Sequence, residues 1–185
     1  LVSLSGGVDS ALVAYAANKK LGKNAFAVTA DYKTLSSEEL DSAKLIAQEI
    51  GINHQIIEYS ELDNENFVKN DEKRCFYCRD ELSVKLLEFS TSLGIKTIVD
   101  GTQSDDMGDY RPGIDALHRN GIRSPLLETQ FTKQLVRQIA KSVGLSIYDK
   151  PSNSCLASRI PWGQRVTAER LVRIEMGEKI IKQKT

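Results

Sequence analysis

Short apolar runs alternate along this chain with longer segments in which apolar residues recur at helical spacing. The apolar runs predict buried strands at residues 1–4, 25–30, 53–59 and 96–101. The amphipathic segments predict helices at residues 9–21, 37–50, within 75–93 and at 132–143, which end at Gly22, Gly51, Gly94 and Gly144. Because strand and helix alternate, the sequence predicts an α/β fold with a doubly wound, mostly parallel sheet.

The length of the chain sets the number of domains. Its 185 residues suffice for one domain with a hydrophobic core. We expect this domain to cover residues 1–165, and residues 166–185 to begin a C-terminal helical region. The chain starts inside a strand pattern without an initiating methionine and ends in a helical one. We therefore expect the natural protein to continue beyond both ends.

Charge and composition narrow the classes of function. Twenty-five basic residues balance 25 acidic ones, whereas a protein that mainly binds nucleic acid usually carries a basic excess. No apolar run approaches the ~20 residues of a membrane span, and no secretory signal peptide is evident. We therefore expect a cytoplasmic homo-oligomer that acts on a small nucleotide, with neither a membrane nor a nucleic-acid partner.

The segment SGGVDS, residues 5–10, joins the first predicted strand to the first predicted helix. In doubly wound sheets, ligands bind at the carboxyl ends of the strands. Gly6 and Gly7 permit close approach, and their amides can point at one anion together with those of the first helical turn. Ser5 and Ser10 add hydroxyl donors. The loop is a predicted phosphate site, although a plain glycine-rich turn has the same composition. It matches neither the Walker loop nor the dinucleotide-binding motif.

Acidic residues accompany this predicted phosphate site. Asp9 suits a phosphate only if Mg²⁺ bridges them; its alternative role is to cap the helix. A second polar loop, residues 100–113, follows the last predicted strand. In this loop Asp105 or Asp106 could hold a metal or a ribose, and Arg111 could pair with a carboxylate or phosphate. The same residue types are also common in ordinary solvated loops.

The three cysteines carry a second kind of chemistry. Cys75 and Cys78 form a C-x-x-C motif, and Cys155 lies far along the chain. The motif lets two thiolates bind one metal centre, and the flanking Arg74 and Arg79 favour thiolate. Three thiolates suit a 4Fe-4S cluster with one iron left open, which could bind and transfer sulfide. Zinc and metal-free thiols are the alternatives.

Together these segments resemble a known family. SGGVDS resembles the PP-loop of N-type ATP pyrophosphatases, whose adenine nucleotide alpha hydrolase-like fold implies ATP cleavage between the α- and β-phosphates. With DGTQSDDMGDYRPG, SPLLE and KPSNSCLASRIPWGQRVT, the chain is similar to the LarE family of ATP-dependent sulfur transferases. That resemblance implies that ATP and Mg²⁺ adenylate the carboxylate of a pyridinium mononucleotide, and that sulfur then displaces AMP in nickel-pincer cofactor biosynthesis. Some members use the sulfur of the cysteine matching Cys155; this chain resembles those that hold a cluster on three cysteines.

The motifs and the resemblance give candidate roles to individual residues. The candidate catalytic residues are Cys155, Arg159 and Asp9. The candidate ATP-binding residues are Ser5, Gly6, Gly7, Asp9, Ser10, Ala30, Gly101 and Thr102. The candidates for substrate or phosphate binding are Arg111, Lys150 and Ser158. The expected cluster ligands are Cys75, Cys78 and Cys155, and the candidate Mg²⁺ ligands are Asp9, Asp105, Asp106 and Glu128. Lys150 also suits an ordinary surface charge, and Glu128 suits a helix start. Trp162 suits a lid or the core, of which the core is favoured.

Three rival functions fit parts of the pattern. A tRNA thiolase of the PP-loop type also combines this loop with cysteines, but needs an RNA-binding surface. An ammonia-using synthetase, of the NAD or GMP synthetase kind, needs no cysteines. A nucleotide sensor would bind ATP without releasing pyrophosphate.

Overall fold

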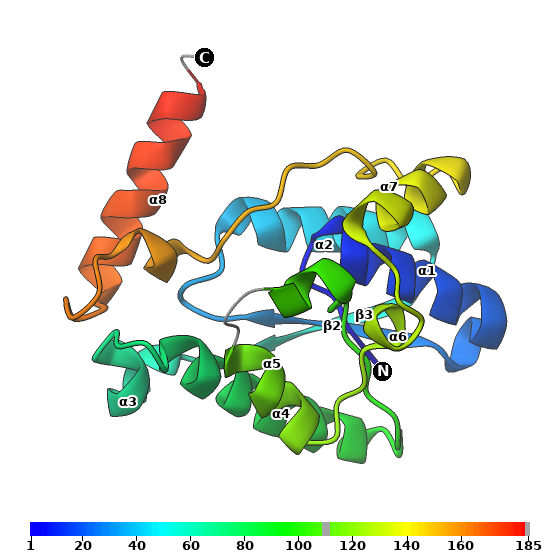
Figure 1. Ribbon diagram of the computed structural model, residues 1–185, viewed down its shortest axis with the longest axis horizontal. Coiled ribbons are helices and arrows are strands. Elements are labelled where there is room, and N and C mark those ends of the chain that lie inside the picture. Colours follow the sequence, from blue (N-terminus) through cyan, green and yellow to red (C-terminus); the bar gives the residue numbers. More distant parts are fainter. Residues whose placement is uncertain (109–111, 184–185) are drawn as a thin grey trace.

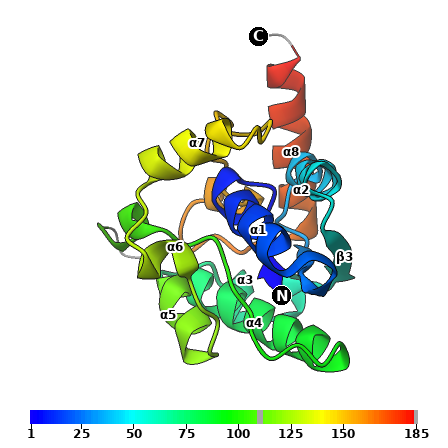
Figure 2. The same ribbon diagram turned by 90° about the vertical axis from the view of Figure 1, so that its right-hand side faces the viewer.

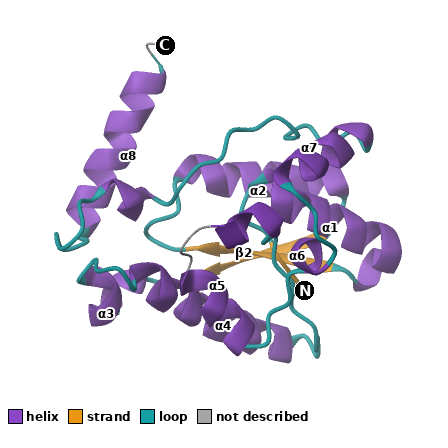
Figure 3. Ribbon diagram, viewed as in Figure 1, coloured by secondary structure: helices purple, strands orange, loops and turns teal. Residues whose placement is uncertain are grey.

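The computed structural model describes residues 1–108 and 112–183. Its centre is a parallel sheet of β1 (Val2–Ser3), β2 (Phe26–Asp31) and β3 (Asn53–Glu58), in the order β1-β2-β3. Val2 pairs with Ala27, and β2 pairs with β3 along its full length. Figure 3 shows these strands between helices on both sides. The α/β class and the parallel sheet predicted from the sequence are confirmed.

The strand predicted at 96–101 is much shorter in the structure. Val99 alone in this segment forms ladder bridges, one to Val2 and one to Arg123, both parallel. β1 has only two residues and Arg123 is a single bridging residue, so neither neighbour can support a longer ladder. The bridges nevertheless continue the sheet beyond β1 and set the position of the polar loop that follows Asp100.

One face of the sheet is covered by three helices, α1 (Val8–Leu21), α2 (Ser37–Ile50) and α7 (Lys133–Ser142) (Figures 1 and 2). These helices share one apolar cluster with β1, to which Leu12, Ile46 and Val136 contribute buried side chains. Packing of this cluster fixes the start of α1 and the start of α7 next to each other, at the carboxyl end of β1.

The opposite face is covered by α4 (Arg74–Ser92) and α5 (Pro112–Arg119). A second apolar cluster joins Val28 of β2, Leu86 of α4 and Leu117 of α5. The sequence did not predict α5. The proline and glycine at its start suggested a turn, but proline is also favoured in the first turn of a helix, and burial of Ala116 and Leu117 holds α5 on α4.

A third cluster lies beyond the sheet. It joins α3 (Glu65–Val68), the 3-10 turn Leu156–Arg159 and α8 (Ala168–Lys182) through buried Phe67, Leu156 and Leu171. Beyond this cluster α8 extends away from the body (Figure 1). The division into domains at residues 165 and 166 stays a prediction.

The remaining described elements are one short helix and three 3-10 turns. The short helix α6 covers Pro125–Glu128, and 3-10 turns cover Gly22–Asn24, Glu61–Asp63 and Ser104–Gly108. The side chain of Trp162 is 67% exposed, so the expected core position is wrong. Among the described helices, none combines the length and apolar content that crossing a membrane would need.

Candidate functional site

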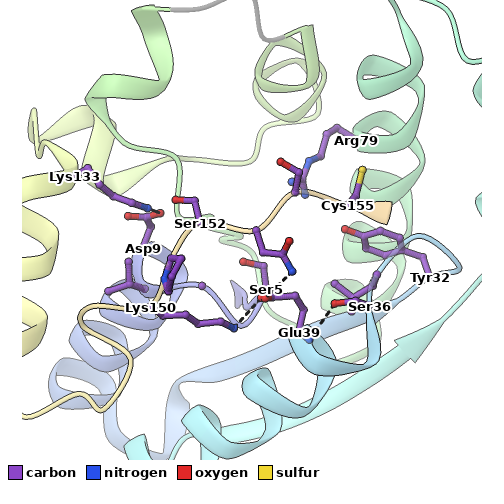
Figure 4. Close-up of a pocket in the computed structure, with 16 residues that line it drawn as sticks. Ser5, Asp9, Tyr32, Ser36, Glu39, Arg79, Lys133, Lys150, Ser152 and Cys155 are labelled. Carbon is purple, nitrogen blue, oxygen red and sulfur yellow. Dashed lines mark hydrogen bonds and ion pairs between the residues drawn. The ribbon is translucent and has the colours of Figure 1, made fainter. Parts of the chain in front are cut away.

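A polar cleft opens at the carboxyl ends of β1 and β2. It consists of two adjoining cavities of ≈ 200 Å³ and ≈ 700 Å³. Both are lined by Ser5, Asp9, Arg79, Lys133, Ser152, Asn153 and Ser154, so they form one continuous space. Figure 4 shows side chains from α1, α2, α4, α7 and the segment before Cys155 converging on it.

The loop SGGVDS forms one wall of this cleft. Gly6 has φ +79°, and a Cβ there would lie 2.4 Å from the carbonyl oxygen of Glu39 on α2. The hydroxyl of Ser10 accepts a hydrogen bond from the Ser5 amide (3.1 Å) and donates one to the Gly7 carbonyl (3.1 Å). Gly7 is the N-cap of α1 and supplies no side-chain cap. The first amides of α1 therefore remain suited to an anion.

Asp9 lies in the first turn of α1, inside the cleft. The N-cap is Gly7, so the alternative role of Asp9 as the helix cap is wrong. One carboxylate oxygen pairs with Lys133 Nζ. The other, Oδ1, is buried and has no hydrogen-bond partner among the described residues. A buried, unpartnered carboxylate oxygen at a phosphate site fits a Mg²⁺ ligand.

The second polar loop packs directly on the start of α1. A Cβ at Gly101 would lie 2.5 Å from the amide nitrogen of Ser10. Asp105 accepts a hydrogen bond from the Lys133 amide (2.8 Å), and Asp106 accepts one from the Gln103 amide (3.0 Å). Both aspartates line the larger cavity. Asp9 lines the same cavity, but the three carboxylates are not arranged as one metal site within the described residues.

Buried Asp100 holds this second loop in shape. It accepts hydrogen bonds from the hydroxyls of Thr102 (2.6 Å) and Ser124 (2.7 Å). The Thr102 hydroxyl, a candidate ATP ligand, therefore donates within the loop, although Thr102 still lines the larger cavity. The prediction for Arg111 lies outside the described residues.

The Lys150 side chain forms hydrogen bonds that support the first loop. Its ammonium donates to the Gly6 carbonyl (2.9 Å), to Glu39 Oε2 (3.0 Å) and to Ser42 Oγ (2.8 Å). It also lines the smaller cavity. These three bonds tie the segment that leads to Cys155 to the phosphate-binding loop, so the alternative of an ordinary surface charge is wrong.

Arg159 and Ser158 hold the backbone around Cys155. Arg159 pairs with Glu178 of α8 (2.6 Å) and donates to the carbonyls of Ser154 (2.5 Å) and Cys155 (3.0 Å). The Ser158 hydroxyl donates to the same Cys155 carbonyl (2.7 Å). Neither residue is among those that line the two cavities. Their contacts are those of positioning residues.

The three cysteines lie at one end of the cleft. Cys75 and Cys78 occupy the first two turns of α4, and Cys155 precedes the 3-10 turn Leu156–Arg159. Cys75 lines the larger cavity and Cys155 the smaller, while Cys78 and Cys155 both contact the third apolar cluster. All three are free thiols. Within residues 1–108 and 112–183, no three His, Cys, Asp or Glu side chains are arranged as a metal site.

Burial sets the protonation of Cys78. It raises the pKa of this thiol to about 12, and although Arg79 lowers the pKa, the nearby Cys155 and Cys75 raise it further. The expectation that the flanking arginines favour thiolate is therefore wrong at Cys78, because loss of solvation outweighs one neighbouring cation.

Two candidates lie away from the cleft. Glu128 pairs with exposed Arg123 (3.0 Å to Nε) and does not line either cavity. α6 has only four residues and Glu128 lies in its first turn, so the helix-start interpretation is confirmed. Ala30 is buried near the end of β2 and is likewise not among the lining residues.

Sequence reasoning missed three cleft residues: Lys133, Arg79 and Tyr32. Lys133 is the first residue of α7, where the cap Thr132 was a usable signal for the helix start. Arg79 was noted only as a neighbour of the cysteines. Tyr32 follows β2, at an edge where ligands are expected, but its side chain gave no local signal.

Comparison with known proteins identifies a matching family and two similar proteins. The family model described as asparagine synthase matches residues 1–97. An uncharacterized protein of Synechocystis sp., slr1717, is 46% identical over 96% of this chain and 66% of its own length. The pyridinium-3,5-bisthiocarboxylic acid mononucleotide synthase of Lactiplantibacillus plantarum is 32% identical over 98% of this chain and 66% of its own length. The chain thus spans about two-thirds of these relatives.

The fold also has solved neighbours. The NMN synthetase of Francisella tularensis superimposes with a TM-score of 0.64 and 18% sequence identity, covering 94% of this chain and 81% of that protein. At this identity the likeness concerns the fold alone.

Proposed function

We propose that this chain, which belongs to the asparagine synthase family, is an ATP-using enzyme of the LarE type. In this proposal ATP activates the carboxylate of a pyridinium mononucleotide, and sulfur then replaces AMP. The relative from Lactiplantibacillus plantarum, named as a synthase of a bisthiocarboxylic acid mononucleotide, supports this substrate class.

One observation carries the proposal. The smaller cavity is lined both by Ser5, Gly7 and Asp9 of the anion-binding loop and by the thiol-bearing Cys155. A phosphate site and a sulfur nucleophile therefore open into the same space. An enzyme that only hydrolyses a nucleotide has no use for that second group.

The first step is adenylation. ATP lies with its phosphates on the amides of SGGVDS and on Lys133, which is already positioned by Asp9. A carboxylate oxygen of the substrate attacks the α-phosphorus, the bond to the bridging oxygen of the β-phosphate breaks, and pyrophosphate leaves. Mg²⁺ bound at Asp9 Oδ1 would supply neutralisation of phosphate charge. The amides and Lys133 stabilise the charge that develops on phosphorus.

The second step is sulfur transfer at the cysteine end of the cleft. A thiol sulfur attacks the acyl carbon, a C–S bond forms, the C–O bond to the adenylate breaks, and AMP leaves. The thiol proton passes to solvent. The Cys155 thioester then loses its Cα proton to solvent and its Cβ–S bond breaks, which releases the thiocarboxylate and leaves dehydroalanine at position 155. Cys155 is the candidate donor because it shares the smaller cavity with the phosphate loop, and Arg159 and Ser158 fix its backbone. The three thiols are not arranged as a metal site, so the sulfur that reacts in this step is that of a cysteine thiol.

The experiment separates the two steps. Asp9→Asn removes the carboxylate that would hold Mg²⁺ and that pairs with Lys133, and we expect about 100-fold slower carboxylate-dependent pyrophosphate release. Cys155→Ser keeps the phosphate site, so it should still give a stoichiometric burst of pyrophosphate but no thiocarboxylate. Loss of the pyrophosphate burst in a folded Cys155→Ser variant would contradict the proposal. Full turnover with ammonia as the nucleophile instead of sulfur would contradict it as well.

A separate measurement decides whether the sulfur donor is an iron–sulfur cluster or a cysteine thiol. The three-cysteine motif of the sequence predicts about four irons with sulfide when the protein is purified without oxygen, whereas the arrangement of the thiols in the structure favours metal-free cysteines. Iron, sulfide and zinc analysis with a visible spectrum checks this. A colourless protein with zinc, or with neither metal, would refute the iron–sulfur form and leave adenylation to be judged by the burst.

A further inference from the structure

Arg79 differs from the other cations that line the cleft. Lys133 pairs with Asp9, and Lys150 pairs with Glu39. Within residues 1–108 and 112–183, the guanidinium of Arg79 forms no ion pair and donates no hydrogen bond, although Arg79 lines both cavities. The buried Asp100 carboxylate attracts this guanidinium without forming an ion pair with it. Since arginine keeps its charge in proteins, the hydrogen-bond donors of Arg79 stay open to an anionic ligand.

Two neighbouring arginines, in contrast, have their guanidinium groups bound to protein groups. Arg74, one turn earlier on α4, donates to Asn70 Oδ1 (2.5 Å) and to the Ala157 carbonyl (2.9 Å). Arg159 pairs with Glu178. Both of these guanidinium groups bind the protein itself. Among the described arginines at this end of the cleft, Arg79 is therefore the one whose donors stay available for a ligand.

Arg79 lies between the two reacting ends of the cleft. It follows Cys78 directly in α4, and Figure 4 shows its side chain close to Cys155 and Tyr32, with Lys133 and Asp9 on the other side of the cleft. An acyl group that is adenylated at the phosphate loop and then attacked by a thiol must occupy this middle position. Arg79 is the cation there.

The packing around Arg79 restricts its stem. A Cβ at Gly113 of α5 would lie 2.8 Å from Arg79 Cγ and 3.1 Å from the Cys75 carbonyl oxygen. The glycine thus lets α5 pack directly on this side chain. A restricted stem holds the planar fork of a guanidinium in one orientation, which favours two parallel hydrogen bonds to a carboxylate.

We propose that Arg79 binds the carboxylate that is adenylated, and so makes the enzyme select a mononucleotide acid over the corresponding amide. This inference rests on the proposed function, because it assigns the carboxylate to the middle of the same cleft. The contact aligns one carboxylate oxygen with the α-phosphorus while the other stays on the guanidinium. An uncharged amide cannot form the charge-assisted pair.

Equilibrium binding tests the inference without turnover. The probes are nicotinic acid mononucleotide and nicotinamide mononucleotide, each titrated in the presence of α,β-methylene ATP. They differ only in a carboxylate against an amide. We expect the wild-type chain to bind the acid about 10- to 100-fold more tightly than the amide, and Arg79→Gln to abolish that preference by weakening the acid alone.

Three further variants complete the test. Arg173→Gln, at an exposed position of α8, is the matched control and should keep the preference. Arg79→Lys keeps the charge without the fork, and Gly113→Ala displaces the stem; both should reduce the preference if Arg79→Gln does not fold. Equal affinities in the wild type, or an unchanged preference in the Arg79 variants, would overturn the inference. Absence of pyrophosphate release with carboxylates would instead count against the proposed function.

Discussion

Two glycines hold the phosphate site together at the residue scale. A side chain at Gly6 would meet the Glu39 carbonyl of α2, and one at Gly101 would meet the start of α1. The nucleotide loop, α2 and the second polar loop are thus in backbone contact. Any displacement of one loop has to move the others, so the anion-binding amides and the aspartates of the second loop keep a fixed relation.

The glycine contacts predict a graded series of stabilities. Gly6→Ala should lower the free energy of unfolding by about 2 kcal/mol or more, because it combines a left-handed φ with a backbone clash. Gly51→Ala, at φ +72° with open space around it, should cost about 1–2 kcal/mol. Gly7→Ala, whose Cβ would be 3.7 Å from the nearest atom, Ser5 Oγ, should change stability least. Urea unfolding measures all three, and equal losses would contradict the steric account.

Lys133 gives a prediction on nucleotide affinity. Replacing it by glutamine removes the ammonium beside Asp9, and a charge-assisted phosphate contact of this kind is expected to be worth about 10- to 100-fold in binding. Calorimetric titration with ATP and Mg²⁺ measures the change. Lys141→Gln, exposed on the same helix, is the control and should bind ATP as the wild type does. Similar affinities for both variants would remove Lys133 from the site.

The limits of sequence reasoning are clear at this scale. The positions of Ser5, Gly7 and Asp9 in the cleft could be predicted because one local strand–loop–helix segment contains all of them. Lys133 and Arg79 could not, because their place in the cleft depends on how α7 and α4 pack against the sheet. No pattern within either helix contains that information.

At the element scale, the buried side-chain amide of Asn70 helps to join the start of α4 to the segment after Cys155. Asn70 donates to the carbonyls of Ile160 (3.2 Å), Pro161 (2.9 Å) and Gln164 (2.9 Å), and its own oxygen accepts from Arg74. It is fully buried and has φ +58°. This junction holds the loop after Cys155 against the helix that carries the other two thiols.

Removing this junction should loosen the Cys155 segment. Asn70→Ala leaves buried carbonyls unpaired, and we expect a loss of about 3 kcal/mol in the free energy of unfolding. Hydrogen exchange should accelerate first in residues 155–166. Asn70→Gly retains the backbone conformation and isolates the amide contribution, and exposed Asn66→Ala is the control. Uniform acceleration across the chain would contradict a local role.

The helices also show why α5 escaped prediction while α2 did not. α2 has local signals at both ends: the Ser36 side chain accepts from the Glu39 amide, and Gly51 adopts the left-handed conformation. α5 begins with a proline and a glycine, which are equally common in turns. Its helical state depends on contact with α4, and such tertiary contact overrides local preference.

At the scale of the whole molecule, the cleft lies where the three apolar clusters meet. The first cluster fixes α1 and α7, the second fixes α4 and α5, and the third fixes the Cys155 segment and α8. The sequence could predict this general location, because parallel α/β sheets bind ligands at the carboxyl ends of their strands. Spacing alone could not show that Cys155 would open into the smaller cavity and Cys75 into the larger one, since these cysteines lie on separate elements.

The most direct test follows one oxygen atom. A pyridinium mononucleotide labelled with ¹⁸O in its carboxylate is incubated with the chain, ATP and Mg²⁺, and the products are analysed by mass spectrometry. If the carboxylate attacks the α-phosphorus, AMP carries one labelled oxygen once sulfur has displaced it, and the pyrophosphate is unlabelled. ADP with inorganic phosphate, or AMP free of label, would contradict adenylation of the carboxylate.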